Sequence, residues 1–547
     1  MTDQPRQSTQ EPLTARIIAD DHFELSAVPD RIFGSFVEHL GRCVYEGIYE
    51  PGHPRADEDG FREDVLELVR ELGATTIRYP GGNFVSGYRW EDGVGPRDSR
   101  PRRLDTAWHS TETNEFGLHE MDAWLKKLSV DGRPNELMEA VNLGTRGLQE
   151  ALDLVEYANV PGGTQLSEQR RANGADEPLN IRMWCLGNEM DGPWQLGHKS
   201  AENYGTLAAD VARGIRQIDP NVELVVCGSS GHNMPTFGQW EDTVLSHTYD
   251  LVDFVSCHAY YEPARYDGDM QSFLASGVDM DGFIKEVGAL IDAAKAKAKS
   301  AHDVYISFDE WNVWYQSAQP SVVPAGIGNW PVAPHLLEDV YTAADAVVFG
   351  DLLITLLKNA DRVKSASLAQ LVNVIAPIMT QRGGDAWRQT TFYPFSLTAR
   401  LAKGGTVLAP KQTSTLIQAK AYGDVESVNS VVIKREDGSY AVFLTNRSLD
   451  TAADVEIVVP SDFAGSSGFS EVEATTLHDD DLSAANTVEN QDRVTPARND
   501  TARLISGGSA GDESASESGG AGESGVSGAT RVKVTLPAVS WTAVVVR

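Results

Sequence analysis

Apolar residues in the first two thirds of the chain follow two different spacings. Short runs rich in β-branched and aromatic residues are typical of buried strands, whereas longer stretches with apolar residues three and four positions apart are typical of amphipathic helices. The helical spacing recurs at 61–73, 200–218 and 280–299. The strand-like runs lie at 31–41, 75–83, 136–144, 181–189, 222–230, 253–261, 304–312 and 363–373. Strands that alternate with helices predict parallel βαβ units.

Eight such strands predict a closed (β/α)8 TIM barrel over residues 31–390 rather than an open sheet. Polar or aromatic residues stand at the ends of nearly all the runs, at Glu38, Asn83, Glu189, His258, Tyr260, Glu310 and Gln370. In a barrel, the carboxyl ends of the strands converge on one face, where active sites are built. In an open sheet they would be spread along an edge. We therefore expect these side chains to surround one mouth.

After about residue 390 the pattern changes to strands and turns. The stretches 426–448, 452–460 and 530–547 alternate apolar and polar residues, which predicts an all-β sandwich, jelly-roll-like, over residues 391–547. The N-terminal segment 1–30 also contains strand-like sequence, and we expect it to join this β domain. Residues 506–528 are rich in Gly, Ser and Glu and lack aromatic residues, which predicts a disordered loop.

Composition and charge narrow the possible partners. The 547 residues include 46 Lys and Arg against 79 Asp and Glu, a net charge of −33. This argues against a nucleic-acid partner, because phosphate binding needs clustered cations. No apolar run is long enough to span a bilayer, and the polar start shows no secretory signal, so we expect a cytoplasmic protein that binds no membrane. The cysteines lack metal-ligand spacing and are expected to be reduced core thiols: Cys43, Cys185, Cys227 and Cys257.

Two glutamates at strand ends have the placement that glycoside hydrolysis needs. Glu189 in LGNE and Glu310 in FDEWN end the fourth and seventh predicted strands. In such a reaction one carboxyl group protonates the leaving oxygen, and the other attacks the anomeric carbon or activates water. Either glutamate alone is more simply explained as a surface carboxylate. The pair is strengthened by tryptophans nearby, which we expect to form the sides of a sugar site: Trp184, Trp194, Trp311 and Trp314.

Several longer stretches carry a family resemblance between residues 30 and 395. They are GSFVEHLGRCVYEGIY (34–49), RYPGGNFVSGYRWEDGVGP (78–96), TNEFG (113–117), WCLGNEMDGPWQLGH (184–198), SCHAYY (256–261), DEWNVWY (309–315) and LAQLVNVIAPI (368–378). In these stretches the chain resembles the α-L-arabinofuranosidases of glycoside hydrolase family 51. The resemblance implies an exo-acting, retaining enzyme without cofactor or metal that removes terminal arabinofuranosyl units from arabinoxylan- or arabinan-derived oligosaccharides. It also implies a homo-oligomer, by resemblance a hexamer.

The resemblance also implies a role for each candidate residue. Glu189 corresponds to the general acid/base and Glu310 to the nucleophile that forms a covalent intermediate. Asn188 corresponds to a residue that contacts the sugar 2-hydroxyl, and Tyr260 to a hydrogen-bond donor to the nucleophile. The residues implied to bind the arabinofuranose or shape its subsite are Glu38, Asn83, Trp108, Trp311 and Gln370. At the position of Asn83 some relatives carry a different residue. From its place on the sixth strand, His258 is expected to orient the carboxylates without touching the sugar.

Other interpretations remain open from the sequence. Glu38 is also explained as a structural carboxylate paired with Arg42 or Arg78. His258, together with Glu38 and His39, offers the residue types of a metal site, although the chain has no HExxH motif. The alternative functions are a retaining glycosidase of other specificity, such as an endo-β-glucanase or β-xylosidase, a non-catalytic carbohydrate-binding protein, and a metal hydrolase. An open groove would favour the endo-acting enzyme, and a closed pocket the exo-acting one.

Overall fold

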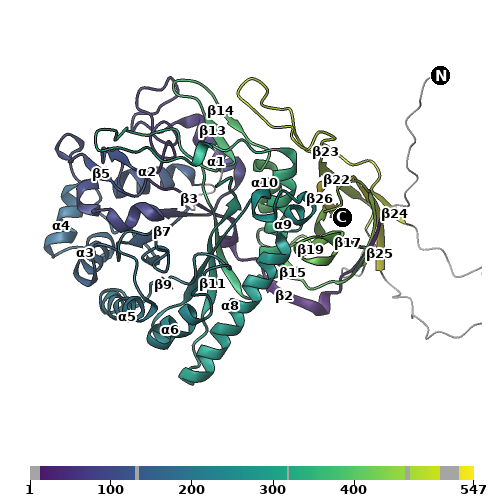
Figure 1. The fold of residues 1–547 in the computed structure, drawn as a ribbon, viewed down its shortest axis with the longest axis horizontal. Coiled ribbons are helices and arrows are strands. Elements are labelled where there is room, and N and C mark those ends of the chain that lie inside the picture. Colours follow the sequence, from purple (N-terminus) through teal and green to yellow (C-terminus); the bar gives the residue numbers. More distant parts are fainter. Residues whose placement is uncertain (1–12, 130–134, 317–318, 462–468, 506–528) are drawn as a thin grey trace, which may run out of the picture.

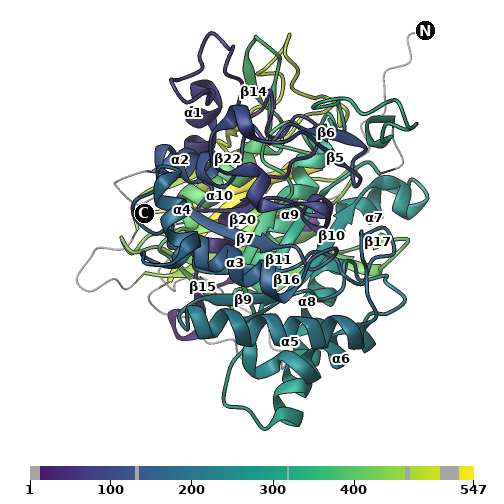
Figure 2. The ribbon, with the colours of Figure 1, turned by 90° about the vertical axis from the view of Figure 1, so that its left-hand side faces the viewer.

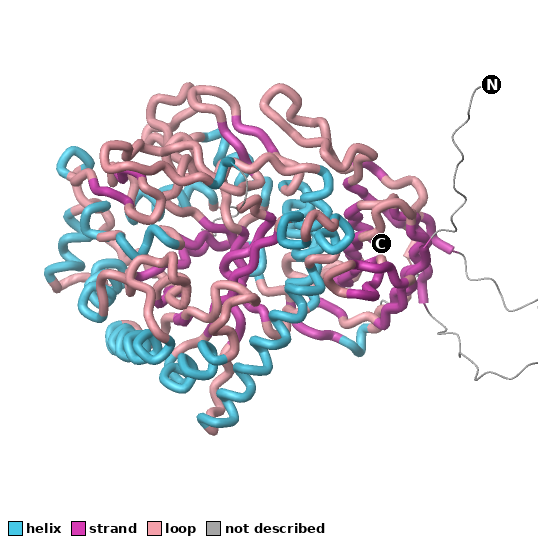
Figure 3. Tube along the Cα trace, in the orientation of Figure 1, coloured by secondary structure: helices cyan, strands magenta, loops and turns pink. Residues whose placement is uncertain are grey.

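The computed structural model describes residues 13–129, 135–316, 319–461, 469–505 and 529–547. A barrel and a smaller β domain lie side by side (Figure 1). Coloured by secondary structure, the larger body has strands at its centre and helices around them, and the smaller body consists mainly of strands (Figure 3). The predicted loop at 506–528 lies outside the described residues.

The larger body is a closed barrel of parallel strands. Around the barrel, the order is β10 (Phe254–Tyr261), β11 (Tyr305–Val313), β12 (Val363–Leu368), β3 (Gly34–Phe36), β4 (Thr76–Tyr79), β7 (Glu136–Val141), β8 (Met183–Leu186) and β9 (Glu223–Val226). Each strand coincides with one of the eight predicted runs, so the barrel prediction is confirmed. Glu189 follows the fourth strand in the chain, β8, and Glu310 lies on the seventh, β11.

Helices surround the barrel strands, and α5 and α6 run along one side of it (Figure 2). The helices are α1 (Glu63–Leu72), α2 (Leu118–Leu128), α3 (Leu148–Asn159), α4 (Gln165–Ala172), α5 (Ala201–Ile218), α6 (Gln239–Thr248), α7 (Met270–Leu274), α8 (Gly277–Ala298), α9 (Ala343–Lys358) and α10 (Phe392–Ala402). Within the described ranges, none of them combines the length and apolar character needed to cross a membrane. Helix α9 is buried almost throughout because it packs against barrel strands and against strands of the β domain.

The β domain consists of two facing sheets. The five-stranded sheet has the order β16 (Lys411–Ser414), β1 (Leu13–Ile18), β21 (Ala453–Pro460), β25 (Ala529–Leu536) and β24 (Arg503–Ile505). The seven-stranded sheet has the order β2 (Glu24–Ala27), β15 (Thr406–Leu408), β19 (Val428–Lys434), β20 (Tyr440–Asn446), β26 (Ser540–Val546), β22 (Val472–Leu477) and β23 (Ala497–Arg498). Alternate apolar residues of both sheets, such as Ile17, Val442 and Val534, form one shared core. Because β1 and β2 pair with strands of these sheets, they support the assignment of segment 1–30 to this domain.

The all-β region begins later than the boundary expected at residue 391. Helix α10 follows that position and packs against α1 and α9 of the barrel. Its buried residues Phe392, Phe395 and Ala399 recur at helical spacing. The first β-domain strand after the barrel is β15, which begins at Thr406.

The four cysteines are buried, free thiols, as the sequence predicts. Burial raises the pKa of the Cys43 and Cys227 thiols to about 12. Because the thiolate is the reactive form, these cysteines are chemically inert core residues.

Candidate active site

A cavity of about 860 Å³ opens at the carboxyl ends of the barrel strands. Seven of the predicted site residues line it: Glu38, Asn83, Trp108, Glu189, Tyr260, Glu310 and Gln370. They follow or belong to strands β3, β4, β8, β10, β11 and β12, apart from Trp108, which lies in the hairpin between β5 (Arg103–Asp105) and β6 (Ser110–Glu112). Residues far apart in the sequence therefore meet at a single mouth.

The two predicted catalytic glutamates lie close together. One carboxylate oxygen of Glu189, one of Glu310 and a ring nitrogen of His258 lie within 4.8 Å of one another. The glutamates are 9% and 6% exposed, respectively. Retaining glycosidases hold their two carboxyl groups about 5–5.5 Å apart, whereas inverting enzymes need about 6.5–9.5 Å to admit a water molecule. An approach to within 4.8 Å is too close for an inverting pair and is consistent with a retaining one.

The turn after β8 determines where Glu189 points. Gly187 has φ of 88°, and Glu189 itself has φ of 42°, in the left-handed region that residues other than glycine rarely adopt. Such a conformation persists only where the surroundings enforce it, which is common at active sites. The carboxylate is held from two sides, since His258 Nδ1 lies 2.8 Å from Oε1 and Trp194 Nε1 donates to Oε2 over 2.6 Å.

A bulge in β11 determines where Glu310 points. The pairing with β12 shifts register between Phe308 and Trp311, and Glu310 pairs with His258 of β10. A bulge adds a residue to one strand and redirects side chains. As a result, the consecutive residues Asp309 and Glu310 both reach the barrel interior, where Asp309 Oδ1 lies 3.0 Å from His258 Nε2. Glu310 accepts a hydrogen bond of 2.7 Å from the Tyr260 hydroxyl.

Arg78 connects the network beneath the cavity. It is 1% exposed, donates from Nη1 to Glu310 Oε1 over 2.7 Å, and donates from Nη2 to Asn188 Oδ1 over 2.6 Å. Its Nε also lies 3.8 Å from Asp309 Oδ2. This role of Arg78 was not predicted from the sequence, where Arg78 was expected only as a possible partner of Glu38.

His258 supplies a second buried cation. Although burial opposes its charged form, the charge of Glu310 and the hydrogen bonds to Asp309 and Glu189 raise the pKa of His258 to about 10. The imidazole is therefore protonated at neutral pH. It lies 2.8 Å from Glu189 Oε1 and 3.5 Å from Glu310 Oε2, so that one positive charge faces both carboxyl groups.

Glu189, His258 and Glu310 also have the donor types of a metal site, and among the described residues they are close enough to share an ion. Their hydrogen bonds indicate that these residues do not bind a metal ion. Both ring nitrogens of His258 face carboxylates, and the guanidinium of Arg78 already neutralises Glu310. A divalent cation would have to lie beside these two positive groups, so the geometry favours carboxylates held by cations over a metal centre.

Glu38 is buried against donors of the cavity lining. Its Oε1 accepts hydrogen bonds of 2.9 Å from the Phe84 amide and from Trp108 Nε1. Its Oε2 accepts one of 3.0 Å from Gln370 Nε2. Burial raises the pKa of Glu38 to about 8. The carboxyl group is thus held at the cavity surface by neutral donors.

The alternative explanation of Glu38 as an ion-pair partner of a nearby arginine is wrong. Arg42 instead donates to Glu338 over 2.7 Å. Arg78 donates to Glu310 and Asn188, as described above. Because both arginines are engaged elsewhere, Glu38 is left available to the cavity.

The hairpin that carries Trp108 is fixed at its base and tip. The Asp105 carboxylate accepts hydrogen bonds from the amides of Ala107 and Trp108, over 2.9 and 3.3 Å. His109 stacks on Trp330 with ring centroids 3.7 Å apart. These contacts hold the Trp108 indole over Glu38 at the edge of the cavity.

Two of the four tryptophans expected beside the carboxylates do not reach the cavity. Trp194 and Trp314 line it, whereas Trp184 and Trp311 are fully buried. The Trp311 ring lies 4.8 Å from that of Phe349 on α9. The expectation that Trp311 shapes the sugar subsite is therefore corrected. Side chains alternate along a strand, so Trp311 points to the helix layer once Glu310 points inward.

Asn188 lies beside the cavity lining rather than within it. The residue is 1% exposed, and its Oδ1 accepts the bond from Arg78. The glycine pair after β4 makes this close packing possible. A Cβ atom on Gly82 would lie 3.0 Å from Glu310 Oε1 and 3.4 Å from Asn188 Nδ2, so a side chain there would crowd both groups.

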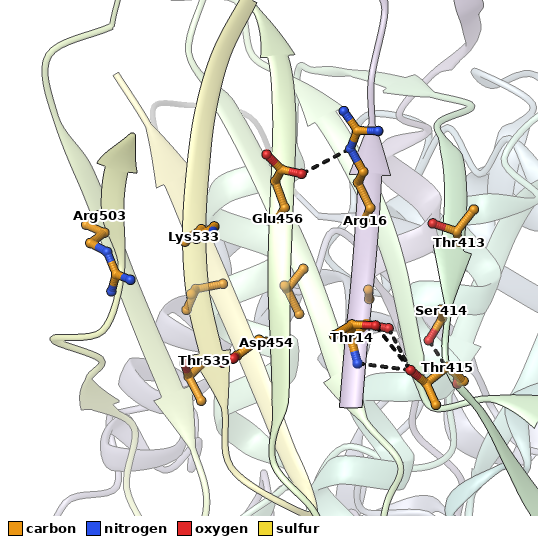
Figure 4. A pocket seen from close by; sticks show the side chains of 13 residues that line it. Thr14, Arg16, Thr413, Ser414, Thr415, Asp454, Glu456, Arg503, Lys533 and Thr535 are labelled. Carbon is orange, nitrogen blue, oxygen red and sulfur yellow. Dashed lines mark hydrogen bonds and ion pairs between the residues drawn. The ribbon is translucent and has the colours of Figure 1, made fainter. Parts of the chain in front are cut away.

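A second hollow, of about 700 Å³, lies on the outer face of the five-stranded sheet of the β domain (Figure 4). None of its 13 lining residues is aromatic. Arg16 pairs with Glu456 at 3.0 Å, and Thr14 bonds to Thr415. Because it lacks both a ring to stack on a sugar and a pair of converging carboxyl groups, this hollow offers no comparable chemistry.

Comparison with known proteins agrees with the barrel. The model of the α-L-arabinofuranosidase 1 domain matches residues 68–276, and that of the α-L-arabinofuranosidase C-terminal domain matches residues 309–510. The chain is 68% identical over 536 residues to an exo-α-(1→6)-L-arabinofuranosidase of Bifidobacterium longum, with 97% of each protein covered. It is 56% identical over 483 residues to an intracellular exo-α-(1→5)-L-arabinofuranosidase of Streptomyces lividans, covering 88% of this chain and 71% of that one.

A solved structure shows the same architecture. It is a family 51 α-L-arabinofuranosidase from Bifidobacterium longum, which matches with a TM-score of 0.86 at 48% identity over 98% of this chain and 100% of that chain. Sequence, fold and cavity agree on a glycoside hydrolase. The chain belongs to the α-L-arabinofuranosidases of glycoside hydrolase family 51.

Proposed function

We propose that this chain is an exo-acting, retaining α-L-arabinofuranosidase that removes terminal non-reducing arabinofuranosyl units from arabinoxylan- or arabinan-derived oligosaccharides. The observation that carries the proposal is the approach of Glu189 and Glu310 to within 4.8 Å at the barrel mouth. Family membership supports arabinofuranose over the substrates of an endo-β-glucanase or β-xylosidase. A complete carboxyl pair supports an enzyme over a non-catalytic sugar-binding protein.

In the first step, ionised Glu310 attacks the anomeric carbon while Glu189 gives its proton to the leaving oxygen. A carbon–oxygen bond to Glu310 forms as the glycosidic bond breaks. Arg78 and Tyr260 hold the two oxygens of Glu310 and stabilise its negative charge until attack. Burial and the charge of Glu310 raise the pKa of Tyr260 well above its ordinary value, so its hydroxyl remains a donor.

In the second step, ionised Glu189 takes a proton from water, and the resulting hydroxide oxygen replaces Glu310 at the anomeric carbon. Negative charge therefore moves from Glu310 to Glu189 after the first step and returns after the second. The protonated His258 faces both groups and favours whichever is ionised. This assigns His258 a positioning and electrostatic role without contact to the sugar.

The remaining predicted residues would hold the arabinofuranose. Glu38, Gln370 and Asn83 present polar groups to the cavity, and the Trp108 indole covers Glu38. Asn188 lies beside the cavity lining, and among the described residues its amide nitrogen has one long side-chain hydrogen bond, of 3.5 Å to Gln195, so it has a donor to offer to a sugar 2-hydroxyl that reaches it. No cofactor enters this scheme. Full activity in EDTA is expected, and inhibition reversed by added metal would contradict it.

The relatives suggest which bonds are cleaved. The names of the Bifidobacterium and Streptomyces proteins specify (1→6) and (1→5) linkages. The 6-oxygen of a hexopyranose and the 5-oxygen of an arabinofuranose are both primary oxygens. We extend this property to the present chain and propose that it cleaves arabinofuranosyl bonds to primary oxygens.

We also propose a cytoplasmic homo-oligomer, a hexamer by resemblance. The location is supported by relatives named as intracellular enzymes. Light scattering coupled to size-exclusion chromatography tests the assembly. A mass of six chains is expected, and a stable monomer at micromolar concentration would contradict the proposal.

Product NMR on a panel of aryl glycosides tests the sugar and the stereochemistry together. Aryl α-L-arabinofuranosides should be hydrolysed, and aryl β-xylosides and β-glucosides should not. With methanol as acceptor, a retaining enzyme forms methyl α-L-arabinofuranoside by trapping the covalent intermediate. A β-configured methyl product would rule out retention, and preferential turnover of another glycoside would rule out the assigned specificity.

A further inference from the structure

The lining of the active-site cavity divides into two arcs around the barrel. Strands β12, β3 and β4 form one arc, which carries Gln370, Glu38 and Asn83. Strands β9 and β10 form the second arc, to which the loops after them contribute residues 230–235, 262, 264 and 265, together with Asp279 from α8. The carboxyl pair lies between the arcs, because Glu189 follows β8 and Glu310 belongs to β11. A volume of about 860 Å³ is more than one pentose fills, so the second arc has room for another unit.

Glu189 protonates the leaving oxygen, so the leaving group must extend along the part of the cavity next to Glu189 that the arabinofuranose does not fill. We propose that residues 230–235 and Arg265 bind the departing sugar, a neutral ring joined to the arabinofuranosyl unit through its primary oxygen. Because a departing sugar exists only in a glycosidase, this proposal rests on the proposed function. The primary carbon adds a rotatable bond between the two sugars, which lets the departing ring extend away from the carboxyl pair toward the second arc.

Unused hydrogen-bonding groups face this arc. Arg265 donates from Nη1 to the Tyr260 carbonyl over 3.1 Å and from Nη2 to Asp279 Oδ2 over 3.2 Å, and its three other N–H groups have no hydrogen-bond partner in the described part of the chain. The amide of Asn233 has no hydrogen-bond partner among the described residues and is exposed at the cavity rim. The indole of Trp194, 52% exposed, offers an apolar face to the same space.

Contacts of His232 and Asp279 hold the side chains of the second arc in fixed positions. His232 Nδ1 lies 2.9 Å from Asp279 Oδ1, and its Nε2 lies 3.0 Å from Glu286 Oε2. The imidazole also stacks on Phe283 with ring centroids 5.0 Å apart. Asp279 in turn holds Arg265, so the guanidinium has a defined orientation before any ligand arrives.

Hydrogen bonds also fix the position of the second arc relative to Glu189 and Glu310. The Ser230 amide and hydroxyl donate to Asp191 Oδ2 over 3.0 and 3.1 Å, and Asp191 lies two residues after Glu189. On the other side, Arg265 bonds to the backbone of Tyr260, whose hydroxyl donates to Glu310. A ring bound by the arc is therefore aligned with the bond to be cleaved.

Two substrates separate binding of the departing sugar from the chemistry. 4-Nitrophenyl α-L-arabinofuranoside has no second sugar, whereas α-L-arabinofuranosyl-(1→6)-D-galactopyranose has one on a primary oxygen. The variants are Asn233→Ala, on an exposed loop, and Arg265→Met, which keeps the length of the aliphatic stem. His247→Gln is the control, because His247 contacts Glu202 on α5, at 3.1 Å, outside the cavity.

The measured quantity is kcat/KM for the disaccharide divided by kcat/KM for the aryl glycoside. We expect this ratio to fall about threefold in Asn233→Ala and about tenfold in Arg265→Met, mainly through KM for the disaccharide, since hydrogen bonds to charged groups contribute more. His247→Gln should leave the ratio unchanged. An unchanged ratio in both cavity variants, or equal losses on both substrates, would overturn the proposal. Wild-type protein inactive on the aryl arabinofuranoside would instead overturn the proposed function.

Discussion

Arg78 and Glu310 are buried on different strands of the barrel and are joined by a hydrogen bond of 2.7 Å from Nη1 to Oε1. The same guanidinium donates from Nη2 to Asn188, the residue before Glu189. One planar group thus fixes the carboxylate on β11 and the turn after β8. This relationship makes Arg78 the structural link between the two halves of the proposed catalytic pair.

Replacement of Arg78 by Lys retains the charge but not the planar fork. A lysine ammonium is a point donor and cannot hold Glu310 and Asn188 in the same geometry. We expect kcat on an aryl arabinofuranoside to fall at least about tenfold, with a smaller change in KM. Arg78→Met should in addition lower the free energy of unfolding by about 3–5 kcal/mol, because Glu310 and Asp309 lose a buried counter-charge. Wild-type kcat in Arg78→Lys would contradict this role.

Azide should rescue Glu189→Ala and Glu310→Ala with opposite stereochemistry. Without its acid/base, the enzyme still forms the Glu310 ester from substrates with good leaving groups, and azide then attacks that ester to give the α-azide. Without its nucleophile, azide attacks the substrate directly and gives the β-azide. Product NMR distinguishes the two anomers. The same anomer from both variants would contradict the assigned roles.

Replacement of Asp309 by Asn should shift the pH dependence through His258. Burial opposes the charged imidazole, but Glu310, Asp309 and Glu189 raise its pKa from 6.5 to about 10. A group with a raised pKa stabilises the fold fully below its unfolded pKa and loses that contribution as pH rises through the folded one. The contribution of His258 is thus complete below pH 6.5 and lost toward pH 10.

Without the Asp309 charge, the pKa of His258 falls, so this loss and the alkaline limb of kcat/KM should move to lower pH by about one unit or more. Melting temperatures and kcat/KM measured from pH 5 to 10 test the shift. Asp303→Asn is the control, since Asp303 forms its ion pair with Lys295 on the surface. Coincident pH profiles for wild type and Asp309→Asn would refute the proposed coupling.

Replacement of Trp194 by Phe removes one hydrogen bond to Glu189 and keeps an aromatic ring. The lost donor is Nε1, 2.6 Å from Glu189 Oε2. Protonation of the leaving group matters most when that group is a poor one, so kcat/KM should fall about three- to tenfold for a methyl arabinofuranoside. For a dinitrophenyl arabinofuranoside, which needs little protonation, the change should be small. Equal losses on both substrates would assign Trp194 to binding alone.

The contact between the barrel and the β domain predicts opposite effects for two helical glycines. A Cβ atom on Gly350 of α9 would lie 2.2 Å from Trp541 Cδ1, whereas one on Gly282 of α8 would meet no atom within 4 Å. Gly350→Ala should therefore lower the free energy of unfolding by about 1–3 kcal/mol through overpacking. Gly282→Ala should raise it by up to about 1 kcal/mol, because alanine favours helix. Denaturant unfolding measures the free energy of unfolding of both variants. An unchanged value for Gly350→Ala would show that Trp541 can move to accommodate the added methyl group.

Much of the fold was predictable from the sequence because its signals are local. Each barrel strand coincides with a run of apolar residues, and the polar residues at the run ends lie at one mouth. Helix α10 was missed because its short apolar pattern, from Phe392 to Ala402, directly precedes the first β-domain strand. The boundary expected at residue 391 therefore assigned α10 to the β domain, although this helix packs against the barrel helices.

Strict strand alternation also limited the prediction of the site. It explains why Trp311, next to Glu310, faces α9 rather than the cavity. The same rule would turn Asp309 outward, yet the bulge in β11 brings Asp309 in to His258. Asp309 gave no sequence signal, because a bulge depends on how neighbouring strands pair.

By itself, the sequence determined the barrel, the two glutamates and the family, because apolar spacing and motif residues are properties of the chain. Only the tertiary structure decided which side chains share the buried charges around those glutamates. Arg78, His258 and Asp309 come from three strands, and their partners are set by closure of the barrel and the bulge in β11. Burial then makes these pairings electrostatically strong, since a low-dielectric interior screens charges far less than water does.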